Sequence, residues 1–179
     1  MTTLETTSTP TAETALRTLY FVRSAFAIVW AAALLLTAST AGPLLTVVLV
    51  VYPLFDAAAV FWQLRSRGDA RVPELVNIVV SVAVAVALGW ASTVSMSAAL
   101  VVWGLWAIGA GIPQLITAVR RRSAGGQVAQ MFSGGISVVA GAAFLAQGLG
   151  GADSITGVGG YAVLGAVFFL ISAFRLRTR

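Results

Sequence analysis

The 179-residue sequence contains neither cysteine nor histidine. The first absence excludes disulfides, thiolate metal sites and iron–sulfur clusters. The second removes the side chain that most often binds metals or acts as a base near neutral pH. Among the few ionisable residues that remain, no pair of nucleophile and general base is visible. We therefore predict a protein that is not an enzyme and that carries no cofactor or bound metal.

Charged residues are also scarce. Only 9% of the residues are charged and 59% are hydrophobic, whereas an ordinary soluble domain has about 25% charged residues. So few charges are not enough to cover the surface of a water-soluble domain of this size. The composition therefore indicates a protein whose main solvent is lipid.

Six apolar segments follow a polar, threonine-rich beginning. Each is about 20 residues long, the length at which a helix crosses about 30 Å of hydrocarbon. The segments are continuously apolar rather than alternating, which argues against a β-barrel. We predict an all-α polytopic membrane protein, with a disordered cytoplasmic tail at 1–17 and a transmembrane domain at 18–177. The predicted spans are 18–38, 44–64, 72–91, 95–119, 127–147 and 154–174.

The basic residues predict the orientation in the membrane. All eleven are arginine, and ten of them precede the first span or follow spans two, four and six, whereas the other connections contain none. The positive-inside rule makes this side cytoplasmic, so we predict both termini in the cytoplasm of a bacterial inner (plasma) membrane. Anionic lipid headgroups attract arginines at such positions, an explanation that we prefer to nucleic-acid binding. The ten are Arg17, Arg65, Arg67, Arg71, Arg120, Arg121, Arg122, Arg175, Arg177 and Arg179.

An internal repeat is visible in the apolar segments. The heptapeptide LVVYPLF at 49–55 is echoed by LVVWGLW at 100–106, and GGYAVLG beginning at Gly159 is a weaker echo. We interpret the chain as three helical hairpins, at about 18–67, 72–122 and 127–177. Because every hairpin has two spans, the copies are parallel and are related by an axis along the membrane normal. The alternative is that helices rich in alanine, valine and glycine always resemble one another.

Each of the three hairpins contains charged, small, aromatic or turn residues that carry a resemblance to a known family. They are Arg23–Ser24, Pro43, Tyr52 and Asp56–Ala57 in the first, Trp103, Gly109 and Gly111 in the second, and Gly134, Gly141, Tyr161 and Gly165 in the third. This pattern resembles the HdeD-like acid-resistance membrane proteins over about 16–177. Ser24 and Ala57 depart from it, since the family has glycine after the arginine and after the aspartate. The resemblance implies a small bacterial inner-membrane protein linked to acid or other envelope stress, without a defined reaction.

Two ionisable residues lie deep inside predicted spans. Arg23 is about 6 Å deep in the first span and Asp56 about 12 Å deep in the second, at 1.5 Å per residue. In an antiparallel hairpin they have similar heights, so we expect them to form an ion pair that lowers the cost of insertion. We interpret the pair as a packing contact. The alternative is a proton or ion step at Asp56.

Other polar residues form a weaker layer near the cytoplasmic side. Glu74 follows Pro73, which suits the first turn of a helix, where a carboxylate meets the helix dipole. Asn77 and Gln114 are interpreted as interhelical contacts rather than parts of a substrate site. These three are the secondary site candidates.

Small residues at four-residue spacing predict close helix packing within the chain, with a homo-oligomer seam as the alternative. Examples are Ala107 with Gly111, Ser137 with Gly141, and Ala162 with Ala166.

Five tryptophans separate into two groups by depth. Trp62 and Trp90 near span ends are expected to lie at the membrane interface. Trp30, Trp103 and Trp106 are deeper and are expected to pack inside the protein.

The leading interpretation is a non-enzymatic, HdeD-like integral membrane protein. One alternative is a small transporter or channel that uses Asp56 and Arg23. Another is an oligomeric membrane scaffold subunit. The lipid bilayer is the expected partner in all three.

Overall fold

The computed structural model describes residues 12–39, 41–67, 72–120 and 127–175, and this part of the chain folds into six α-helices with short connections. All six helices are long and apolar enough to cross a membrane. The prediction of an all-α polytopic fold is therefore confirmed. The helices are α1 (Ala12–Thr37), α2 (Pro43–Arg67), α3 (Val72–Val94), α4 (Met96–Arg120), α5 (Gln127–Leu149) and α6 (Thr156–Arg175).

Helix α1 begins earlier than predicted. Residues 12–17, which we assigned to the disordered tail, belong to its first turns. Alanine, leucine and glutamate are good helix formers, and they extend the helix beyond the apolar span. The rest of the predicted tail, 1–11, lies outside the described residues. The other five helices begin and end within three residues of the predicted boundaries.

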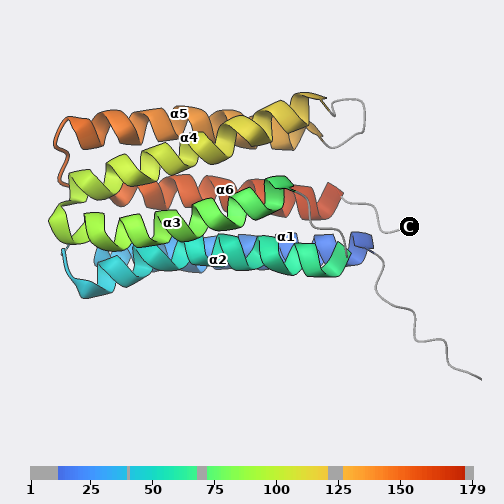
Figure 1. Ribbon diagram of the computed structural model, residues 1–179, viewed down its shortest axis with the longest axis horizontal. Coiled ribbons are helices and arrows are strands. Elements are labelled where there is room, and N and C mark those ends of the chain that lie inside the picture. Colours follow the sequence, from blue (N-terminus) through green and yellow to red (C-terminus); the bar gives the residue numbers. More distant parts are fainter. Residues whose placement is uncertain (1–11, 40, 68–71, 121–126, 176–179) are drawn as a thin grey trace, which may run out of the picture.

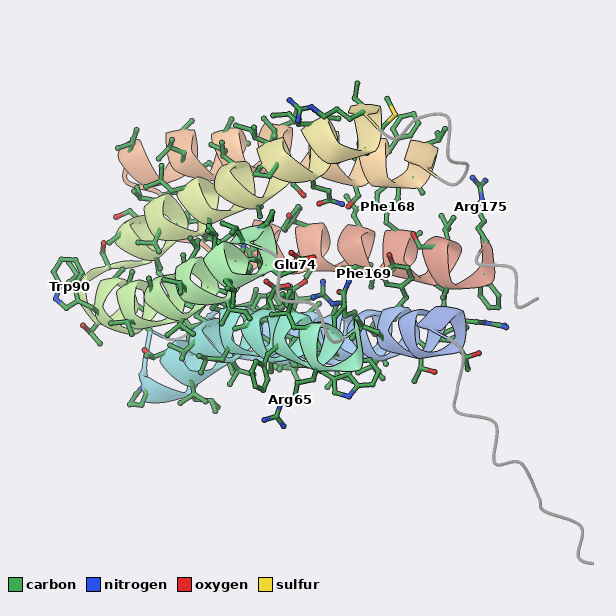
Figure 2. The ribbon with its side chains drawn as sticks, turned by 45° about the vertical axis from the view of Figure 1, so that its right-hand side comes forward. Arg65, Glu74, Trp90, Phe168, Phe169 and Arg175 are labelled. Carbon is green, nitrogen blue, oxygen red and sulfur yellow. The ribbon has the colours of Figure 1, made fainter. Side chains whose placement is uncertain are left out.

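The six helices run up and down along one common direction, so the start of α1 and the ends of α2, α4 and α6 lie at the same end of the bundle (Figure 1). Arg17, Arg65, Arg120 and Arg175 are at these helix ends. We call this end of the bundle the arginine end. In Figure 2, Arg175 lies at the arginine end and Trp90 at the opposite end.

The helices form a closed ring. Each packs against its neighbours in the chain, and α6 packs against α1. The most extensive contacts are between α4 and α5, followed by α1 with α6 and α2 with α3, whereas α1 with α2 and α5 with α6 touch less. The hairpins that we expected are thus not the most tightly packed pairs, and the three-hairpin repeat stays a prediction.

Glycines allow α4 and α5 to pack at backbone contact. A Cβ atom on Gly104 would lie 2.6 Å from the carbonyl oxygen of Gly141, and a Cβ on Gly141 would lie 2.8 Å from the carbonyl oxygen of Gly104. Gly111, Gly134 and Gly148 are equally confined by the partner helix. The prediction of close packing within the chain is confirmed for Gly111 and Gly141.

Aromatic residues fill the middle of the ring. Trp30 from α1 and Trp103 from α4 are buried and stacked, with 5.2 Å between ring centroids. Tyr52 from α2 and Trp106 pack against them. The predicted packing role of the three deep tryptophans is confirmed, whereas Trp62 and Trp90 are exposed on the outer surface.

Candidate functional site

The Asp56 carboxylate is bound by three side chains from two other helices. The Arg23 Nη2 atom of α1 lies 3.3 Å from Asp56 Oδ1. Asn77 Nδ2 and Ser81 Oγ, both from α3, donate hydrogen bonds of 2.9 and 3.0 Å to Asp56 Oδ2. Both carboxylate oxygens are therefore in contact with protein groups. We call these four residues the Asp56 network.

The Asp56 network lies inside the apolar spans. Asp56 is nine residues from the end of its span at Arg65, and Ser81 is nine residues from the start of its span at Val72, about 14 Å at 1.5 Å per residue. Arg23 is six residues inside the span that begins at Arg17, about 9 Å deep. The long arginine side chain closes this difference in height, as the sequence predicted.

The spacing of Asn77 and Ser81 explains why both reach Asp56. Residues four apart lie on one face of a helix, and α2 and α3 form one of the three extensively packed pairs. Ser81 is fully buried. Sequence reasoning missed Ser81, although its position four residues after Asn77 was a usable signal.

Arg23 also connects α1 to α6. Its Cζ atom lies 5.4 Å from the ring centroid of Phe169, within the range of a cation–π interaction. Close by on α1, Ser24 Oγ donates a 2.9 Å hydrogen bond to the carbonyl oxygen of Ala166. Arg23 thus contacts α2 through its ion pair and α6 through its guanidinium face. Within the described part of the chain, the Nε atom of Arg23 is buried without a hydrogen-bond partner.

Glu74 lies on the same face of α3 as Asn77 and Ser81, one turn nearer the arginine end. It is half-buried, and its Oε2 atom is buried without a hydrogen-bond partner among the residues that the structure describes. Glu74, Asn77 and Ser81 therefore form a row of polar groups that runs from the start of α3, at the arginine end, to Asp56. Gln114 is on α4 and is not among the residues that bind Asp56.

The aromatic core begins one turn from Asp56. Tyr52 precedes it by four residues on α2 and packs against Trp30 and Trp103. The Trp103 Nε1 atom is buried and has no hydrogen-bond partner in the described ranges. Large aromatic rings thus fill the middle of the bundle on the side of Asp56 that faces away from the arginine end.

The acidic residues of the described chain are too dispersed to bind a metal ion together. Across the described ranges, no group of three or more aspartates and glutamates has the geometry of a metal site. The charges in the Asp56 network instead compensate one another, as buried charges must.

Comparisons with known proteins found no relative of this chain. The chain matches no protein-family model, no curated protein and no solved structure. The resemblance to HdeD-like proteins and the scaffold and homo-oligomer interpretations therefore stay predictions.

Proposed function

We propose that the chain is a non-enzymatic bacterial inner-membrane protein that acts in the response to acid or envelope stress, as the resemblance to HdeD-like proteins implies. The observation that supports a non-catalytic role is that both oxygens of the Asp56 carboxylate are bound by protein side chains. Its two oxygens bind Arg23, Asn77 and Ser81, so the carboxylate joins α1, α2 and α3. In this proposal the Asp56 network is an intramembrane clamp that holds the helices together.

The proposed orientation places the arginine end in the cytoplasm. The exposed Arg65, Arg120 and Arg175 at this end support it, because basic residues are retained on the cytoplasmic side. A reporter fused after Arg179 should be active in the cytoplasm, and a periplasmic signal would contradict the orientation.

The stress role predicts an acid-survival phenotype. A strain that lacks the gene should survive acid challenge less well than its parent, and the wild-type gene should restore survival. If the clamp is only structural, the apolar double variant Arg23→Met/Asp56→Leu should restore survival too, provided that it reaches the membrane in normal amounts. Unchanged survival of the deletion strain would overturn the stress role. A well-folded double variant that does not restore survival would overturn the structural clamp.

A small proton or cation transporter is the second candidate, and Glu74 favours it. A buried carboxylate oxygen without a partner is costly unless a proton, a cation or water satisfies it. Glu74 has such an oxygen at the outer end of the polar row that leads to Asp56. This row is the arrangement expected of a path from the membrane surface to an intramembrane carboxylate.

Flux measurements on proteoliposomes separate the two candidates. The transporter predicts a pH- or cation-driven flux that is abolished in folded Asp56→Asn and reduced in Glu74→Gln. The clamp predicts no flux above that of protein-free liposomes. Asp56→Asn keeps the shape of the side chain, so this variant is expected to fold. Its free energy of unfolding is measured in the same preparation to check this.

A further inference from the structure

An apolar groove lies between α1 and α2 near the arginine end. Its volume is about 270 Å³, and it opens to the outside of the bundle. Thr18 and Val22 of α1 and Phe55, Ala58 and Trp62 of α2 contribute to its wall. The small side chain of Ala58 and the limited contact between α1 and α2 leave this space unfilled.

The groove has the depth of one membrane leaflet. Trp62 is three residues and Phe55 ten residues from the end of the span at Arg65, which places the lining between about 5 and 15 Å deep. Half of a hydrocarbon core of about 30 Å is the same distance. The lining is almost wholly apolar, so a hydrocarbon chain is the chemistry that it fits.

Arg65 stands at the membrane-surface end of the groove. It follows Trp62 by three residues and Ala58 by seven, so it shares their face of α2. It is exposed, with its Cζ atom 4.9 Å from the ring centroid of Phe61, and Figure 2 shows it pointing away from the bundle. Within the described part of the chain no carboxylate forms an ion pair with Arg65. A guanidinium at this position matches a phosphate, which it binds through paired hydrogen bonds.

We propose that Arg65 and the α1–α2 groove form a binding site for one anionic phospholipid. The phosphate binds Arg65, and one acyl chain lies along Val22, Ala58 and Phe55. The positive charge of Arg65 lies at the membrane surface, where the lipid phosphate lies. The apolar wall of the groove lies deeper, where the acyl chain lies. This site does not depend on the proposed function, because it lies on the outer surface and shares no residue with the Asp56 network.

Native mass spectrometry in mild detergent tests the site. The protein is supplied with phosphatidylglycerol or with phosphatidylcholine, and the lipid that it retains is counted. We expect one tightly held phosphatidylglycerol, at least fivefold weaker retention in Arg65→Gln, and reduced retention in Ala58→Leu and Ala58→Trp, which fill the groove. Arg120→Gln is the matched control, since it removes an exposed arginine from the same end of the bundle but from α4, and it should retain lipid as the wild type does.

Several outcomes would overturn the proposal. Equal loss in Arg65→Gln and Arg120→Gln would indicate general attraction of headgroups, and equal retention of both lipids would remove the role of charge. Normal retention in both groove-filling variants would show that the acyl chain lies elsewhere. A dimer that Ala58→Leu dissociates would assign the groove to a second copy of the chain. Because Arg65 is exposed, Arg65→Gln is expected to fold. The test therefore stays decisive even if Ala58→Trp fails to fold.

Discussion

Replacing Gly104 by alanine is expected to destabilise the protein by about 1–3 kcal/mol, the usual cost of overpacking. The added Cβ would lie 2.6 Å from both the carbonyl oxygen of Gly141 and the amide nitrogen of Leu145. These are backbone atoms, so no side-chain rotation relieves the clash and α4 must move away from α5. Gly104→Val should cost more. The measurement is unfolding in SDS titrations of the protein in mixed micelles.

Gly109 provides the matched control for Gly104. It is on the same helix, but a Cβ there would meet nothing within 4 Å. Gly109→Ala should therefore be neutral or slightly stabilising, since alanine favours the helix by up to about 1 kcal/mol over glycine. Gly135→Ala provides the same control on α5. Equal stabilities of Gly104→Ala and Gly109→Ala would contradict the backbone contact between α4 and α5.

Replacing Asp56 by alanine is expected to destabilise the protein by about 3 kcal/mol, because Arg23 is then left within the membrane without its counter-charge. The side chains of Arg23 and Asp56 are 15% and 22% exposed, so both charges are largely removed from solvent. Arg23→Met should be less costly, since Asn77 and Ser81 still donate to the Asp56 carboxylate.

The double variant Arg23→Met/Asp56→Leu tests how much the ion pair between Arg23 and Asp56 contributes to stability. Replacement of both partners of a buried ion pair by apolar residues is often neutral. The double variant should therefore be more stable than Asp56→Ala, losing mainly the bonds from Asn77 and Ser81 at about 0.6 kcal/mol each. Asp56→Leu completes the cycle and should behave as Asp56→Ala does. A coupling free energy near zero between the two sites would contradict the ion pair.

The course of the chain through the membrane followed from composition because lipid imposes simple rules. A span must be long and apolar, and arginines gather at one side, so six helices with boundaries within a few residues were predictable for all but the start of α1. The packing partners of each helix were not predictable. The helices are apolar on most of their surface, so hydropathy does not show which face of α4 meets α5. That contact depends on glycines such as Gly104, whose importance lies in the missing side chain.

The candidate site was partly predictable for a related reason. A charge inside a span is rare, so Arg23 and Asp56 stood out, and counting residues from the turn placed them at similar heights. Asn77 was noted as an interhelical contact without an identified partner. Ser81 carries a weaker signal, because serine is common in membrane helices. Its position four residues after Asn77 suggests a shared face of α3, but its contact with Asp56 depends on the rotation of α3 against α2. Glu74 was interpreted through the helix dipole, which does not show that one of its oxygens is buried.

Because the ring closes between the first and the last helix, the fold cannot be completed until the last helix is made. Helix α1 emerges first and α6 last, yet α1 and α6 form one of the most extensive contacts. Ser24 finds its hydrogen-bond acceptor 142 residues later in the chain, at Ala166, and Arg23 finds the Phe169 ring only in α6. Until the sixth helix is inserted, one side of the first helix has no native partner. The newly made protein must therefore keep α1 within reach while five further spans enter the membrane.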